Sequence, residues 1–230
     1  MVLVIAHRGA SGYYPENTLK SIEYAIEMGS DIIEIDLKMT KDHQIVLMHD
    51  EAIDRTTNGK GWVKDLTVQQ LKALDAGDGE RVPLLTEVME LYKKGEVKFM
   101  FDISSPGYEE QIVDLIHKHN YDTRSVVSGA YEPLRFIKLL DPRLKIAPSF
   151  DRASDHSIME TASMGGVIFN CHHASISREA VDIAHVYGLQ VIAWGVNEVE
   201  SVHRMIEVGA DGITSDYPDV VRRMVSLARA

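Results

Sequence analysis

Residues 27–36 read Glu-Met-Gly-Ser-Asp-Ile-Ile-Glu-Ile-Asp, and residues 207–216 read Glu-Val-Gly-Ala-Asp-Gly-Ile-Thr-Ser-Asp. In both segments a glycine follows a helical pattern, where a left-handed C-cap conformation suits it, and the next apolar run ends in aspartate. This near-repeat predicts one unit of helix, turn and strand that the chain uses more than once. Gly188, between Tyr187 and Leu189, marks a third such junction.

Short apolar runs alternate with amphipathic helical patterns along most of the chain. Such alternation is typical of a parallel sheet, and eight strands in 230 residues favour a closed (β/α)8 TIM barrel that forms one domain, residues 1–230. The expected strands are 2–6, 31–38, 97–103, 124–128, 144–148, 166–170, 189–196 and 211–215. The expected helices are 18–28, 84–94, 108–119, 132–140, 154–164, 177–187, 198–208 and 218–228.

Residues 50–83 interrupt this alternation. They contain the turn-rich stretch Thr57-Asn58-Gly59-Lys60-Gly61 and a short helical pattern from Thr67 to Leu74. We interpret the segment as a small inserted subdomain after the second barrel strand, and we expect it over the mouth of the barrel.

Composition limits the classes of function. Hydrophobic residues make up 45% and charged residues 26% of the chain, which is ordinary for a soluble globular protein. The 35 acidic residues exceed the 24 Lys and Arg residues, and no basic block is present, so nucleic acid is not an expected partner. Cys171 is the single cysteine, which excludes an intramolecular disulfide and a cysteine-rich metal site and favours the cytoplasm.

The apolar runs are too short for a signal peptide at the N-terminus or for a membrane span elsewhere. We therefore expect no stable membrane insertion, although a membrane lipid can still be the substrate. Oligomeric state does not follow from the sequence.

Polar side chains collect where apolar runs end. His7 and Arg8 follow the first run, His49 follows residues 45–48, and Asp102 follows residues 99–101. In a parallel barrel, catalytic residues gather at the carboxyl ends of the strands. Arginine binds phosphate with two parallel hydrogen bonds, and histidine transfers protons near neutral pH. The predicted substrate is a phosphate ester.

Glu34 and Asp36 lie two residues apart, so on a strand both carboxylates project from one face. Burying two close carboxylates without a cation is costly. A hard cation with oxygen ligands, Mg²⁺ or Ca²⁺, removes that cost.

Together these motifs resemble the glycerophosphodiester phosphodiesterases over nearly the whole chain. The matching segments are His7-Arg8-Gly9, Pro15-Glu16-Asn17-Thr18, Glu34-Ile35-Asp36, His49-Asp50, Arg55-Thr56-Thr57, Trp194-Gly195-Val196-Asn197 and Gly212-Ile213-Thr214-Ser215-Asp216. The resemblance implies a barrel with a small inserted subdomain and one divalent cation, with Mg²⁺ expected and Ca²⁺ or Mn²⁺ as alternatives. It also implies cleavage of glycerophosphodiesters to sn-glycerol 3-phosphate and an alcohol.

The resemblance assigns roles to individual residues. His7 and His49 correspond to a general acid and base pair, in which one imidazole deprotonates the nucleophile and the other protonates the leaving oxygen. Glu34, Asp36 and Asp102 correspond to the metal ligands.

Further residues are expected at or around the substrate. Arg8 clamps the phosphate, with a surface salt bridge as the alternative role. Glu16 and Asn17 shape the first loop, and Glu16 contacts the metal or a glycerol hydroxyl. Trp194 either packs against the glycerol or fills the top of the barrel. Asp216 either braces the site or caps the last helix.

The third strand departs from the family pattern, which has Glu-x-Lys where this chain has Asp102-Ile103-Ser104. Asp102 keeps a carboxylate, but Ser104 lacks the charge of the phosphate-binding lysine. That loss costs on the order of a few kcal/mol in the transition state unless another cation compensates. Lys98 lies at the opposite end of the run, whereas His172, at the end of the sixth strand, is placed to compensate.

A second departure follows the fourth strand, where the family has Ser-Phe and this chain has Ser128-Gly129. The head-group preference therefore stays open.

The expected activity is that of a metal-dependent glycerophosphodiester phosphodiesterase. One alternative is lysophospholipase D-type hydrolysis of a lipid phosphodiester. The other is a catalytically weak binding protein, suggested by Asp102 and Ser104, although the presence of both His7 and His49 argues against it.

Overall fold

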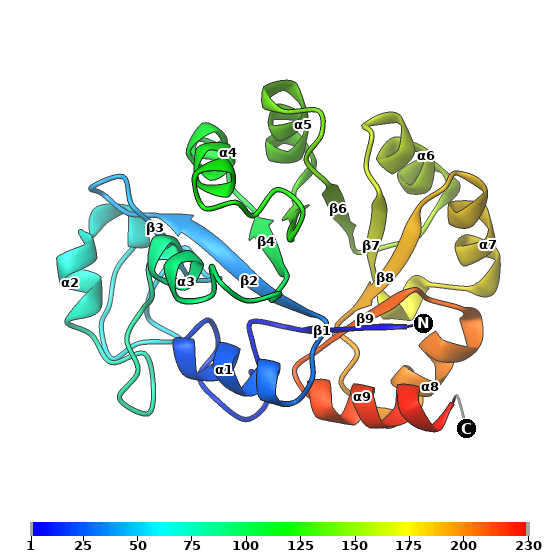
Figure 1. Ribbon diagram of the computed structural model, residues 1–230, viewed down its shortest axis with the longest axis horizontal. Coiled ribbons are helices and arrows are strands. Elements are labelled where there is room, and N and C mark those ends of the chain that lie inside the picture. The colour runs from blue at the N-terminus through cyan, green and yellow to red at the C-terminus, as the bar shows by residue number, and fades with distance from the viewer. Residues whose placement is uncertain (1, 229–230) are drawn as a thin grey trace.

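The computed structural model describes residues 2–228, and its strands close into a parallel barrel surrounded by helices (Figure 1). β1 pairs with both β2 and β9, which closes the ring. The predicted (β/α)8 TIM barrel is confirmed, and no strand bound differs from the expected one by more than two residues. The eight barrel strands are β1 (Leu3–Ala6), β2 (Ile32–Met39), β4 (Phe99–Ile103), β5 (Ser125–Gly129), β6 (Ile146–Phe150), β7 (Ile168–His172), β8 (Gln190–Trp194) and β9 (Gly212–Ser215).

Helices connect the strands and cover the outside of the barrel (Figure 1). Gly29, Gly188 and Gly209, at the three predicted junctions, have positive φ angles of 78°, 72° and 87°, the left-handed conformation that ends a helix. The helices are α1 (Leu19–Glu27), α3 (Leu85–Leu91), α4 (Glu109–Lys118), α5 (Tyr131–Leu140), α6 (Asp155–Ser163), α7 (Arg178–Val186), α8 (Val199–Val208) and α9 (Pro218–Leu227), with the short 3-10 helix η2 (His173–Ser175) after β7.

β3 (Ile45–Leu47) lies outside the barrel ring. It pairs antiparallel with the outer end of β2, where Leu47 faces Leu37. His49 therefore follows a hairpin strand rather than a parallel barrel strand.

The segment 50–83 contains the 3-10 helix η1 (Val63–Asp65) and α2 (Val68–Lys72). α2 is shorter than the helical pattern predicted from Thr67 to Leu74, and Thr67 is its N-cap. Figure 1 shows α2 on the side of β3 that faces away from the barrel. The segment and β3 share a small apolar cluster of their own, composed of Val46, Met48, Ile53, Val63, Leu71, Ala76 and Val82.

The alternation along β2 separates an outer and an inner layer. Ile33, Ile35 and Leu37 belong to the apolar core between the strands and the helices. Ile32 belongs to the cluster that fills the barrel interior. Because side chains two residues apart share a face, Glu34, Asp36 and Lys38 continue this inner row toward the carboxyl end of the strand.

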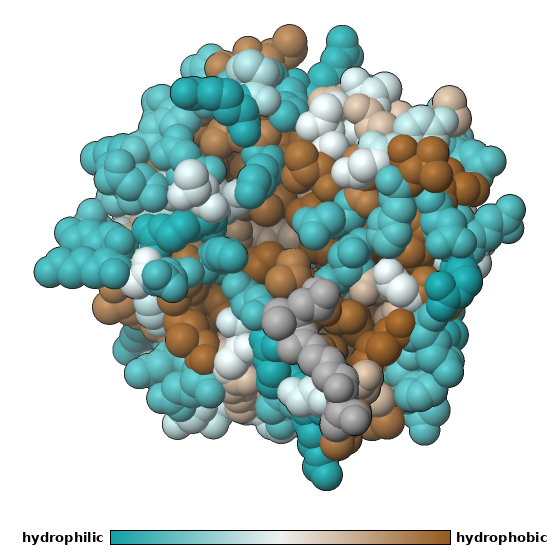
Figure 2. All heavy atoms as spheres, turned by 45° about the vertical axis from the view of Figure 1, so that its right-hand side comes forward, coloured by the Kyte–Doolittle hydropathy of each residue, from teal (hydrophilic) through white to brown (hydrophobic). Residues whose placement is uncertain are grey.

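Hydrophilic and hydrophobic residues are interspersed on the face drawn in Figure 2.

Between residues 2 and 228, the helices are all too short or too polar to cross a bilayer.

Candidate active site

The carboxyl ends of the barrel strands surround a cavity of about 190 Å³. Seven of the eleven site residues named from the sequence line it, namely His7, Arg8, Glu34, Asp36, His49, Asp102 and Trp194. Its other lining residues are Met100, Ser128, Ser149, Asn170 and Thr214. The fold thus brings together side chains from β1, β2, β4, β8 and the end of the β3 hairpin.

Each histidine of the cavity is paired with an aspartate. His7 Nδ1 lies 2.6 Å from Asp216 Oδ1, and His49 Nδ1 lies 2.6 Å from Asp50 Oδ1. When Nδ1 carries its proton toward the carboxylate, Nε2 is the atom available for proton exchange. Asp216 thus contacts His7, while the N-cap of α9 is Tyr217.

Both aspartates are held in the ionised state. Hydrogen bonds from Arg55 and then from His49 keep the pKa of the Asp50 carboxyl well below its usual range. Burial acts to raise the pKa of Asp216, but hydrogen bonds from His7, Ser11 and Asn197 outweigh it and leave that pKa below its ordinary value. An ionised partner orients the imidazole and stabilises its protonated form.

Glu16 joins two arginines at the edge of the cavity. Arg8 Nη1 donates to Glu16 Oε1 at 2.9 Å, and Arg55 donates to both Glu16 oxygens at 2.7 and 2.8 Å. Arg55 also donates to Asp50, so the network connects the phosphate-binding candidate Arg8 to the His49 pair. Arg55 lies in a segment that matches the family, but the sequence alone did not place it in the site.

The loop after β1 adopts strained backbone geometry to form these contacts. Arg8 and Asn17 have φ angles of 55° and 56°, in the left-handed region that non-glycine residues rarely occupy. The Arg8 N–H donates to Glu34 Oε2 at 2.9 Å, and the Asn17 amide exchanges two hydrogen bonds with Asp36. Asn17 therefore orients Asp36 from behind the cavity wall.

Three carboxylates share one wall of the cavity. β2 and β4 pair with Asp36 opposite Asp102, and Glu34 precedes Asp36 on the same face. Burial and repulsion from Asp36 raise the pKa of Asp102 to about 6. Burial, followed by repulsion from Asp36 and Asp102, raises the pKa of Glu34 well above its ordinary value. The three carboxylates repel one another, and the nearby Arg8 guanidinium offsets only part of the effect on Glu34.

The donor chemistry of this wall fits a hard divalent cation, since all three groups offer carboxylate oxygens. Within residues 2–228, no group of three His, Cys, Asp or Glu side chains is arranged as a metal-binding cluster. Some of the oxygens instead face protein donors, because Arg8 Nε lies 3.0 Å from Asp36 Oδ2 and Ser128 donates to Asp102 Oδ2 at 3.0 Å.

Two aromatic side chains expected at the substrate lie next to each other. The His172 and Trp194 rings meet edge to face, with 4.6 Å between their centroids. His172 Nδ1 accepts from the N–H of Ala174. Trp194 lines the cavity, and in the described part of the chain its buried Nε1 has no hydrogen-bond partner.

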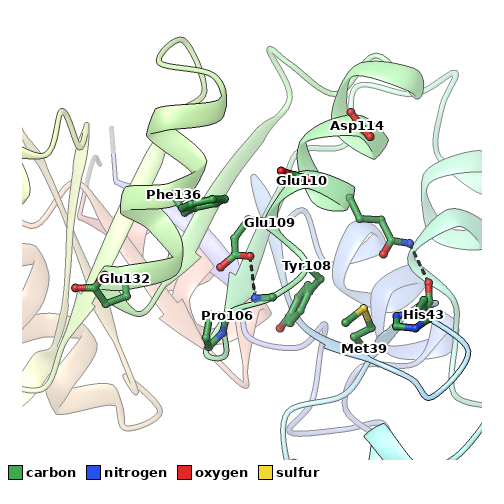
Figure 3. Close-up of a pocket in the computed structure, with 11 residues that line it drawn as sticks. Met39, His43, Pro106, Tyr108, Glu109, Glu110, Asp114, Glu132 and Phe136 are labelled. Carbon is green, nitrogen blue, oxygen red and sulfur yellow. Dashed lines mark hydrogen bonds between the residues drawn. The ribbon is translucent and has the colours of Figure 1, made fainter.

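A larger hollow of about 710 Å³ lies outside the barrel, beside α4 and α5 (Figure 3). Its labelled side chains are mainly apolar or acidic, including Tyr108, Phe136, Glu109 and Glu110. Figure 3 also shows Glu109 accepting from a backbone N–H, that of Gly107. Because the paired histidines and Arg8 line the barrel cavity, we place the active site there.

The barrel and its strand-end cavity, with histidine, arginine and carboxylate groups together, define a barrel enzyme suited to an anionic ester. Residues 7–220 match the family model described as the glycerophosphoryl diester phosphodiesterase family, and the chain belongs to that family. It is therefore an enzyme of the phosphoric diester hydrolase class.

Curated relatives and solved structures agree with this membership. The chain is 36% identical over 236 residues to the glycerophosphodiester phosphodiesterase of Caldanaerobacter subterraneus subsp. tengcongensis, covering 97% of each chain. It is 33% identical to the glycerophosphodiester phosphodiesterase of Bacillus altitudinis, covering 95% of this chain and 96% of the relative. An Oleispira antarctica phosphodiesterase solved in complex with the product sn-glycerol-3-phosphate superimposes with a TM-score of 0.91 at 26% identity, covering 97% of this chain and 96% of that one.

Proposed function

We propose that this enzyme hydrolyses glycerophosphodiesters to sn-glycerol 3-phosphate and an alcohol, with His7 and His49 as the acid and base and with a divalent cation bound. The observation that carries the proposal is the pair of imidazoles, which come from different elements, are each paired with an aspartate, and line one cavity. The product complex of the Oleispira antarctica phosphodiesterase supports the substrate class.

The two histidines divide the proton transfers. One Nε2 accepts the proton of the attacking oxygen, from water or from the neighbouring glycerol hydroxyl, as the new P–O bond forms, and the other imidazolium gives its proton to the alcohol oxygen as the old P–O bond breaks. If the glycerol hydroxyl attacks, water then opens the cyclic phosphate with the two imidazoles in exchanged roles. An alkoxide is a poor leaving group, so protonation of that oxygen is needed for cleavage at neutral pH. Asp216 and Asp50 keep both rings oriented through these transfers.

Arg8 is the proposed phosphate clamp. Glu16 and Asp36 hold its guanidinium in the cavity wall, so little side-chain entropy is lost when an anion binds. Asn170 Oδ1, Trp194 Nε1 and Thr214 Oγ1 are buried cavity-lining atoms without a hydrogen-bond partner in the described part of the chain. Buried polar atoms normally have partners, so these are available to substrate hydroxyls.

Glu34, Asp36 and Asp102 would hold the cation, with Mg²⁺ expected and Ca²⁺ or Mn²⁺ as alternatives. When bound, such an ion compensates the carboxylates and polarises the phosphoryl oxygens. Asn17 and Ser128 support this role, because their hydrogen bonds orient Asp36 and Asp102.

The cytoplasm is the proposed location. Cys171 is buried and is the only cysteine, so the chain has no disulfide of its own that would require an oxidising compartment. Fractionation of the source cells tests this part of the proposal.

A product assay tests the activity. Several glycerophosphodiesters, including glycerophosphocholine, are incubated with the enzyme and Mg²⁺, Mn²⁺ or Ca²⁺, and released sn-glycerol 3-phosphate is measured. Lysophosphatidylcholine is included as the lipid substrate. Exclusive turnover of the lipid would favour the lysophospholipase D-type activity, and no turnover of any diester would leave only a binding role.

A further inference from the structure

A lysine on β2 occupies the place that the family pattern gives to a lysine after β4. The pattern predicts an ammonium at residue 104, where this chain has serine. In the structure, Lys38 Nζ donates a hydrogen bond to Ser104 Oγ. A positive charge is thus present at this position, but it comes from the neighbouring strand.

The position of Lys38 along β2 would allow one ligand to contact both its ammonium and the carboxylates of the cavity wall. Lys38 follows Glu34 and Asp36 in the inner row, and β2 pairs with β4 at Asp36 and Asp102. Two residues of a strand span about 6.6 Å. The lysine therefore lies one step nearer the barrel mouth than the carboxylate wall, a separation comparable to the span of a phosphate with its ligands.

The surroundings of Lys38 hold its side chain in place but leave donors available. Only 5% of that side chain is exposed, although Ser104 itself lies at the exposed rim. An ammonium has three N–H donors. Within residues 2–228, its single hydrogen bond is to Ser104, and Glu51 Oε1 lies at 3.6 Å.

We propose that Lys38 binds the phosphate group of the substrate, and that Ser104 orients its ammonium. This inference rests on the proposed function and names the cation that compensates for the serine at 104. His172, the candidate suggested by the sequence, packs against Trp194 at a different strand end. Lys98 precedes β4 and lies at the opposite end of that strand.

Two variants test the role of Lys38: one removes the lysine, and the other moves it to position 104. Lys38→Met should raise the Kd for sn-glycerol 3-phosphate, measured by calorimetry, by roughly ten- to 150-fold, the usual effect of losing a hydrogen bond to a charged group. The loss should shrink as ionic strength rises, because salt screens the charge. Lys38→Met combined with Ser104→Lys should recover most of the affinity, since the ammonium then comes from β4.

A control variant, a test of folding and a second substitution of Lys38 complete the experiment. Lys98→Met removes the same charge at the far end of β4 and should leave the Kd unchanged. Thermal unfolding shows whether each variant folds, and Lys38→Gln replaces Lys38→Met if the latter does not. Wild-type affinity in folded Lys38→Met or Lys38→Gln overturns the inference. The Kd is measured without turnover, so it tests the role of Lys38 even if the wild type hydrolyses no diester. Absence of hydrolysis by the wild type would reject the proposed function, not the role of Lys38.

Discussion

Replacing Asp216 by asparagine tests the support that the structure gives to His7. The two side chains are joined by a 2.6 Å contact, and Ser11 and Asn197 also donate to the Asp216 carboxylate. Asparagine keeps the size of the residue but removes the charge, and its amide can present an N–H to His7 Nδ1, which favours the wrong tautomer.

The expected decrease in kcat follows from the kind of hydrogen bond that is lost. A hydrogen bond to a charged group contributes about 1.5 to 3 kcal/mol. At 1.36 kcal/mol for each factor of ten, that loss corresponds to roughly a ten- to 150-fold decrease in kcat. We expect KM to change by less than about threefold, because Asp216 acts on His7 rather than on the phosphate.

Initial rates on glycerophosphocholine measure both constants. Asp219→Asn is the matched control, since Asp219 lies three residues further along, in the first turn of α9, and accepts a hydrogen bond from the Tyr13 hydroxyl at 3.0 Å instead of contacting His7. It should leave kcat unchanged. If folded Asp216→Asn retains kcat within about threefold of the wild type, the aspartate does not support the catalytic imidazole and the reasoning fails.

Three other expectations concern the same cavity. His7→Ala and His49→Ala should each lower kcat by at least about a hundredfold, while calorimetry shows sn-glycerol 3-phosphate still bound; near-normal kcat would remove that histidine from the mechanism. EDTA should abolish activity and a divalent cation should restore it, but not in Glu34→Gln; full activity of metal-free enzyme would reject the cation site. The folded protein retains the Asp102 proton up to about pH 6, whereas the unfolded chain loses it near the ordinary value of 3.8, so without metal the free energy of unfolding should fall as pH rises through this interval. Melting temperatures measured from pH 4 to 7, with and without Mg²⁺, check the last expectation, and a rise over this range without metal would contradict it.

Local patterns in the sequence determined most of the fold. Strands and helices follow from the spacing of apolar residues, which depends on neighbours only a few positions away. The carboxyl ends of parallel strands meet at one end of a barrel, so the motifs toward the carboxyl ends of β1, β2 and β4 predicted that His7, Asp36 and Asp102 lie together. All three line the same cavity.

Only the tertiary structure decided which side chains pair. His7 and Asp216 are 209 positions apart, and Lys38 and Ser104 are 66 positions apart. Such contacts depend on strand register and on closure of the barrel between β1 and β9, and a one-residue shift in register would point a side chain to the other face. Apolar periodicity carries no information about these partners. For this reason the sequence predicted the residues of the site, whereas the pairing of Asp216 with His7, the arginine network through Arg55 and the contact of Lys38 with Ser104 emerged only from the folded chain.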